Sequence, residues 1–154
     1  MLSLDTLLLV LHGLSAGVLA GASIHNALLS WRDYVRGRST NVRLQRLYPR
    51  VIAGAWLFTF ALGLLIYPAF RVGARVTTFD PHLPLATGFF EMKEHWLGIA
   101  ALLLLYLVPT SAHLGPRATP PVDRALYHLA TIALGIIVAY ATLTGMTLTA
   151  IQPL

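Results

Sequence analysis

The fold is decided by a long stretch without Asp, Glu, Lys or Arg, residues 6–31, with the sequence TLLLVLHGLSAGVLAGASIHNALLSW. These 26 residues lie between Asp5 and Arg32. A helix of about 20 mostly apolar residues crosses the hydrocarbon core of a bilayer. The stretch therefore predicts a membrane-spanning helix.

Three further segments of the 154-residue chain share this lack of charge: 20 residues after Arg50, 22 after Glu94 and the 30 that follow Arg124. The whole chain is 56% hydrophobic and 11% charged, with a mean hydropathy of +0.70, whereas a soluble domain is about a quarter charged. We expect an all-α membrane protein that forms a single domain over residues 1–154 and lies in the lipid bilayer. The expected spans are about 4–31, 48–70, 91–108 and 123–150.

The basic residues are distributed unequally among the connections. Eight lie in or beside the first and third loops and three in or directly after the second: Arg32, Arg36, Arg38, Arg43, Arg46, Arg50, Arg117 and Arg124 against Arg71, Arg75 and Lys93. Cytoplasmic loops of membrane proteins carry an excess of Lys and Arg. We therefore expect an up-down-up-down bundle with both termini extracytoplasmic, in a bacterial cytoplasmic membrane. The same rule explains the net charge of +5 without a nucleic-acid partner.

The composition also excludes several classes of function. The chain has no cysteine, which rules out disulfides, cysteine-held iron–sulfur clusters and covalently attached haem. The connections are too short for a soluble catalytic domain of usual size, about 100 residues. A redox cofactor would have to be held non-covalently, and histidine is the most suitable ligand.

Five of the six histidines fall in or beside the expected spans. His12 and His95 lie toward the outer side, and His25, His113 and His128 lie toward the inner side. Two layers of histidine on facing helices are typical of bundles that bind haem b. We expect one or two haems, with His12 and His95 ligating iron in the outer layer. The alternative is that these histidines form hydrogen bonds between helices or lie at the interface.

Small residues form a row on the first helix at a spacing of four. Gly13, Gly17 and Gly21 continue to His25, and such a row allows another helix or a flat cofactor to approach closely. Both occupants remain open, with helix packing the commoner one. We expect Leu at position 17 or 21 to be more damaging than Leu at Gly63.

The start of the third span contains a cluster of ionisable residues, Glu91-Met92-Lys93-Glu94-His95-Trp96. Glu91 and His95 are four residues apart and lie on one helix face. A carboxylate beside an imidazole orients it and raises its basicity. We therefore expect Glu91 to support His95, and we consider Lys93 and Glu94 candidate catalytic residues. The alternative is a charged helix start at the outer interface.

The first span resembles the first helix of small b-haem-associated membrane proteins, which include the CopD-like copper-resistance proteins and the HemJ-type protoporphyrinogen oxidase. The resemblance rests on Leu11-His12-Gly13 with the following glycines, on the basic first loop, and on Leu62-Gly63-Leu64-Leu65 in the second span. It implies that His12 is a haem ligand or catalytic histidine and that Lys93 corresponds to the third-helix lysine of the oxidase. The tryptophan and proline signature of the oxidase is absent, so protoporphyrinogen oxidation is not predicted.

Three functions are compatible with these features. The first is a b-type cytochrome-like protein that transfers electrons, alone or in a larger redox complex, with quinone as a candidate partner. The second is a cofactor-free accessory subunit that packs against other membrane subunits. The third is a small membrane enzyme or transporter that uses the outer His, Glu and Lys residues.

Overall fold

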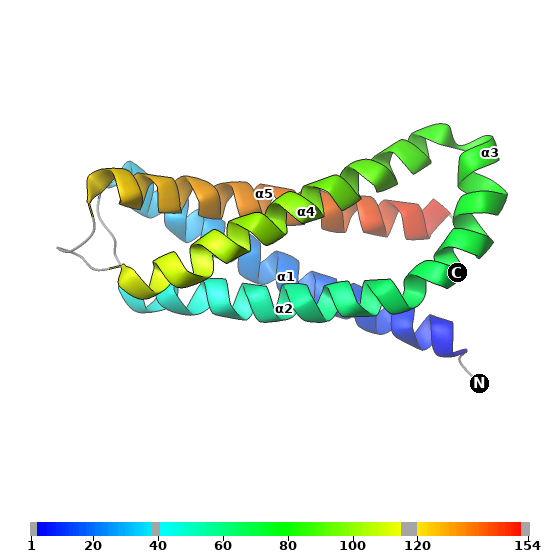
Figure 1. Ribbon diagram of the computed structural model, residues 1–154, viewed down its shortest axis with the longest axis horizontal. Coiled ribbons are helices and arrows are strands. Elements are labelled where there is room, and N and C mark those ends of the chain that lie inside the picture. Colours follow the sequence, from blue (N-terminus) through cyan, green and yellow to red (C-terminus); the bar gives the residue numbers. More distant parts are fainter. Residues whose placement is uncertain (1–2, 38–40, 115–119, 152–154) are drawn as a thin grey trace.

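The computed structural model describes residues 3–37, 41–114 and 120–151, and within these ranges it contains helices and no strand. Figure 1 shows the four long helices extending along the length of the molecule. The elements are α1 (Leu4–Val35), α2 (Val42–Phe70), the π-helix η1 (Arg71–Phe79), α3 (Asp80–His82), α4 (Pro84–His113) and α5 (Pro121–Ile151).

Four helices are long and apolar enough to cross a membrane, as the charge-free segments predict. The helix ends agree with the expected spans at Leu4 and Phe70 and extend beyond them elsewhere. The side chain of Ser3 accepts from the Thr6 amide and that of Asn41 from the Leu44 amide, which satisfies amides that a helix start leaves unpaired. The third span was expected to end at about residue 108, but Pro109 lies inside α4, which continues to His113.

The second connection, between α2 and α4, is helical throughout most of its length. Pro68 lies near the end of α2, where a proline removes a helix hydrogen bond and bends the axis. The chain then turns through η1 and α3 across the end of the molecule (Figure 1). α1 begins and α5 ends at this end, here called the η1 end, and α1 ends and α2 begins at the other.

Ion pairs of Arg75 hold the turn through η1 and α3 in place. The Arg75 guanidinium donates to Glu91 Oε1 at 2.6 Å and lies 3.5 Å from Asp80 Oδ1. Asp80 Oδ1 also accepts from the Thr87 hydroxyl at 2.8 Å. Arg75 therefore ties η1 to α3 and to the beginning of α4. Beneath it lies an aromatic cluster: Tyr67, Phe70, Phe79 and Phe90.

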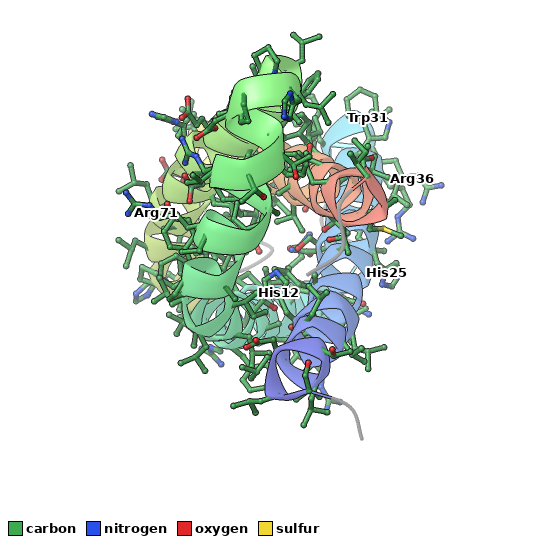
Figure 2. All side chains as sticks on the ribbon, turned by 90° about the vertical axis from the view of Figure 1, so that its right-hand side faces the viewer. His12, His25, Trp31, Arg36 and Arg71 are labelled. Carbon is green, nitrogen blue, oxygen red and sulfur yellow. The ribbon has the colours of Figure 1, made fainter. Side chains whose placement is uncertain are left out.

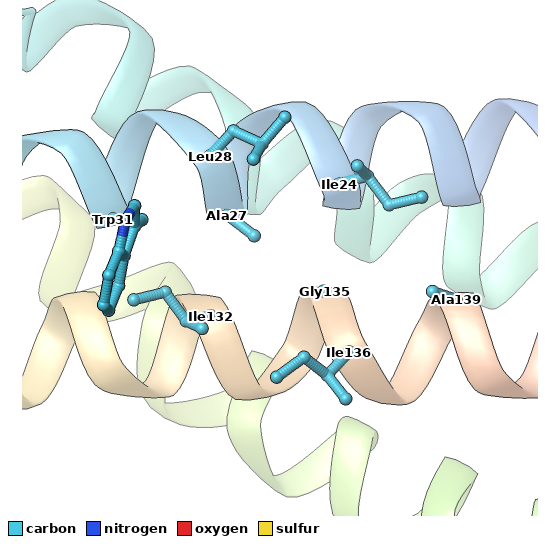
Figure 3. A pocket seen from close by; sticks show the side chains of 8 residues that line it. All are labelled: Ile24, Ala27, Leu28, Trp31, Ile132, Gly135, Ile136 and Ala139. Atoms are coloured by element: carbon cyan, nitrogen blue, oxygen red, sulfur yellow. The ribbon is translucent and has the colours of Figure 1, made fainter.

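Helix α1 packs against both α2 and α5, and α4 packs against α5 and α2. α1 and α5 approach each other closely at Gly135. A Cβ atom at this position would lie 2.6 Å from Ala27 Cβ and 3.2 Å from the Ser23 carbonyl oxygen. Figure 3 shows Gly135 facing Ala27 beside an apolar groove of about 370 Å³. This glycine sets the distance between the two helices.

The end opposite η1 carries most of the described arginines and is here called the arginine-rich end: Arg32, Arg36, Arg43, Arg46, Arg50 and Arg124. Hydrogen bonds join the helices there. Arg46 Nε donates to the Leu114 carbonyl at 3.2 Å. The Tyr127 hydroxyl donates to the Gln45 carbonyl at 2.7 Å. These contacts connect α2 with the end of α4 and the beginning of α5.

Candidate functional site

His12 is the best-positioned candidate ligand in the described part of the chain. It is half-buried on α1, and its Nδ1 lies 3.0 Å from the Thr59 carbonyl oxygen on α2. A carbonyl oxygen can only accept a hydrogen bond, so Nδ1 is the protonated nitrogen in this contact. Nε2 of the neutral ring then carries a free lone pair. His12 is therefore able to ligate a metal ion or accept a proton through Nε2.

The contact with Thr59 depends on a glycine one turn further along α2. A Cβ atom at Gly63 would lie 3.2 Å from His12 Cε1, so the missing side chain leaves room for the imidazole edge. Thr59 Oγ1 also donates to Ser15 Oγ at 3.0 Å, and Ser15 Oγ donates to the His12 carbonyl at 2.9 Å. The histidine is thus held from both α1 and α2.

Lys93 of α4 is directed toward the same interior. It is half-buried, and its Nζ lies 4.6 Å from the centre of the buried Phe90 ring. Figure 2, viewed from the η1 end, shows His12 pointing from α1 into the region between the helices. The two residues singled out by the resemblance thus both lie in the half of the bundle next to the η1 end. The site combines a histidine with a free Nε2 and a cation.

The other ionisable residues of the segment 91–96 do not form one site with Lys93. The Glu91 carboxylate accepts from Arg75, and His95 Nδ1 lies 2.7 Å from the Glu91 carbonyl rather than its carboxylate. Support of His95 by the Glu91 carboxylate, expected from their spacing, is therefore not formed. His95 and Glu94 are exposed. α4 buries Phe90 and Ala100, and at about 100° per residue His95 lies on the other side of the helix. The structure does not bring His95 to His12.

The other candidate histidines lie toward the arginine-rich end and do not form a layer. His25 is exposed, contacts the Tyr48 hydroxyl through Nδ1, and points away from the interior in Figure 2. His113 is exposed at the last residue of α4. His128 is 2% exposed, and neither ring nitrogen has a hydrogen-bond partner among the described residues.

No helix of the described bundle packs closely against the glycine row of α1. Gly13, Gly17 and Gly21 are exposed, and a Cβ atom at any of them would meet nothing within 4 Å. The expectation that Leu at position 17 or 21 is more damaging than at Gly63 is therefore reversed, because Gly63 contacts His12 and the other two face open space. The close glycine contact of α1 involves Gly135 of α5 instead.

Sequence reasoning missed a row of buried polar residues on α1, here called the polar seam: Ser23, Asn26, Ser30 and Asp33. Their spacing of three, four and three residues places them on one helix face, a signal that was present in the sequence. Asp33 Oδ2 accepts from Gln45 Nε2 at 2.8 Å. Polar side chains at such positions join helices within membranes.

Among the described residues, no group of three or more His, Cys, Asp or Glu side chains gathers into a metal site. A haem iron needs fewer protein ligands, so a histidine such as His12 is the relevant feature. Comparisons of the chain with protein-family models, curated proteins and solved structures found no match.

Proposed function

We propose that the protein is a membrane-embedded b-type haem protein that transfers electrons, alone or as a subunit of a larger redox complex, with His12 as an iron ligand. The observation that carries this proposal is the tautomer of His12. Its Nδ1 donates to the Thr59 carbonyl and leaves Nε2 free. Metal-ligating histidines commonly donate their second nitrogen to a backbone carbonyl or carboxylate in this way.

The neighbouring residues suit a haem. The porphyrin carries two carboxylates, and the ammonium of Lys93 is a nearby cation able to pair with one of them. At the η1 end, Phe90 and Tyr67 stack on one another and make the surroundings apolar. A haem bound there would supply one-electron chemistry. His12 would hold the iron, Lys93 would pair with a porphyrin carboxylate, and the aromatic residues would exclude water from the apolar part of the site.

Purification from haem-replete cells tests the proposal. We expect a reduced-minus-oxidised spectrum of b type for the protein, lost in His12→Ala and retained in His82→Ala. His82 is an exposed histidine at the same end, so the control removes an imidazole without touching the interior. A colourless wild-type protein without iron, or equal pigment in both variants, would contradict the assignment.

We further propose that the arginine-rich end is cytoplasmic, that the helices form an up-down-up-down bundle, and that the membrane is a bacterial cytoplasmic membrane. The support is the excess of basic residues at one end. Arg38 and Arg117, which belong to that count, lie outside the described residues. On this proposal, His12 and Lys93 lie toward the extracytoplasmic side.

As redox partner we propose a membrane-soluble quinone. Its support is a groove of about 600 Å³ between the beginning of α4 and the end of α5, where Tyr140 and Thr144 lie among mostly apolar side chains. The Tyr140 hydroxyl is buried without a hydrogen-bond partner in the described part of the chain. Tyr140→Phe should raise the quinol concentration needed for half-maximal haem reduction, whereas Tyr106→Phe, outside the groove, should not. Equal values would exclude this groove.

A cofactor-free accessory subunit is the second candidate, favoured by the open face at Gly13, Gly17 and Gly21. A partner helix would cover that face. It becomes the better proposal if the protein purifies without pigment and Gly17→Leu releases a membrane partner that stays bound to a Leu14→Phe control.

A further inference from the structure

The polar seam and its neighbours hold buried polar atoms without partners. Ser23, Asn26 and Ser30 are at most 1% exposed, Gln45 and His128 are 2% exposed, and each has side-chain atoms without a hydrogen-bond partner in the described residues. These atoms are Ser23 Oγ, Asn26 Nδ2 and Oδ1, Ser30 Oγ, Gln45 Oε1, and His128 Nδ1 and Nε2.

These atoms lie together at the contact of α1 with α5 and the beginning of α2. Ser23 is opposite Gly135 of α5, and the buried His128 precedes Gly135 by seven residues, about two turns, so both lie on one face of that helix. Gln45 joins the group because its Nε2 donates to Asp33 and its carbonyl accepts from Tyr127, the residue before His128. The cluster therefore extends from the arginine-rich end toward the middle of the bundle.

The chemistry of the cluster identifies its ligand. Buried polar groups are nearly always hydrogen-bonded, to protein or to ordered water. The free atoms include donors, such as Asn26 Nδ2, and acceptors, such as Gln45 Oε1. A cation would use the acceptors alone and would leave donors such as Asn26 Nδ2 unpaired. Water both donates and accepts, so water fits this set.

The cluster stops before the His12 site. Toward the η1 end, the next buried residues of α1 are Leu19 and Ala20, which pack with Leu134 and Val138 in the main apolar cluster. The polar residues Ser15 and His12 follow only beyond this layer. An apolar layer thus separates the polar seam from the proposed haem site.

We propose that the polar seam is a water-filled dead end, entered from the arginine-rich end, that reaches His128 and is sealed from the His12 site by the apolar layer around Leu19 and Val138. The bound species is a short file of water molecules that hydrogen-bonds Ser30, Asn26 and His128. The proposal is independent of whether a haem is bound.

The absence of cysteine from the chain makes a direct test possible. Single variants Ser30→Cys and Asn26→Cys are purified in full length and exposed to Ag⁺, an ion of about the size of water. The remaining thiol is then counted after denaturation. The matched control is Leu134→Cys, which is equally buried at 1% exposure but lies in the main apolar cluster.

We expect Ag⁺ to block positions 30 and 26 at least about tenfold faster than position 134, because a dry buried thiol reacts only after local opening. Position 30 should react faster than position 26, since it lies nearer the entry. Equal rates at positions 30 and 134 would overturn the hydrated seam. A faster reaction at position 26 than at position 30 would overturn entry from the arginine-rich end.

Asn26→Leu provides a measurement that needs no labelling. If the amide is dry and unpaired, its replacement by an apolar residue with the same branched shape raises the melting temperature or leaves it unchanged. If water satisfies the amide, the variant loses these hydrogen bonds and melts at a lower temperature. We expect the lower value, and a higher or unchanged value would count against hydration.

Discussion

At the scale of single residues, the Tyr127 side chain supplies a hydrogen bond that Pro49 cannot donate. In a regular helix the Gln45 carbonyl would accept from the amide of residue 49, but Pro49 has no N–H. The Tyr127 hydroxyl donates to this carbonyl instead, at 2.7 Å. A buried carbonyl that the proline leaves without its helix partner is thereby satisfied from α5.

Tyr127→Phe should therefore lower the free energy of unfolding by about 1 kcal/mol, because it leaves a buried carbonyl without its partner. In a Pro49→Ala background the helix amide is restored, and the same change should cost clearly less. Thermal or denaturant unfolding of the four proteins gives the coupling. Additive effects would show that Tyr127 does not replace the missing amide.

Glycines on α1 and α5 should respond in opposite ways to a single added methyl group. Gly135→Ala places a Cβ atom 2.6 Å from Ala27 Cβ, which forces α1 and α5 apart and should cost about 1–3 kcal/mol. Gly17→Ala enters open space and should be neutral or slightly stabilising, since Ala favours helix more than Gly. Melting temperatures in detergent measure both. A Gly17 variant less stable than the Gly135 variant would indicate that α1 and α5 do not pack as described.

At the scale of elements, the turn through η1 and α3 is held by the ion pairs of Arg75. Glu91 is half exposed, and exposed ion pairs contribute at most about 1 kcal/mol. The pair therefore acts on the position of η1 more than on the stability of the bundle. Because α4 begins directly after this turn, Arg75 also helps to place Lys93.

Arg75→Gln should change the melting temperature little but accelerate amide hydrogen exchange in residues 71–83. The physical reason is that η1 loses its tie to α4 while the four long helices keep their packing. Arg71→Gln is the control, since Arg71 is exposed and forms no ion pair within the described part of the chain. Unchanged exchange in the Arg75 variant would mean that the aromatic cluster alone holds the turn.

At the scale of the whole molecule, the unequal charge of the two ends predicts the orientation in the membrane. Cysteines introduced at Ser3 and Gln152 should react with an impermeant thiol reagent in intact cells, and one at Ser39 should not. Ser39 and Gln152 lie outside the described residues, so the test rests on the ends of the neighbouring helices. The opposite labelling pattern would reverse the orientation and place His12 toward the cytoplasm.

The sequence by itself determined the four helices and their membrane environment, because both follow from local properties: the length of each charge-free segment and the apolar character within it. It also identified His12 and Lys93 as candidates. The positions of the helix ends were less predictable. α4 continues through Pro109, where packing against the surrounding helices keeps the chain helical.

The tertiary structure decided which residues of each helix face the interior. A helix that is apolar all round gives little periodicity from which to read its buried face. The sequence therefore did not show which of Lys93 and His95, two residues apart, faces the interior. Packing turns Lys93 inward and His95 outward, leaves Gly17 open and presses Gly135 against Ala27. The bond from Tyr127 to Gln45 joins residues 82 positions apart. Such contacts depend on how helices rotate and dock against one another, which no local stretch of sequence specifies.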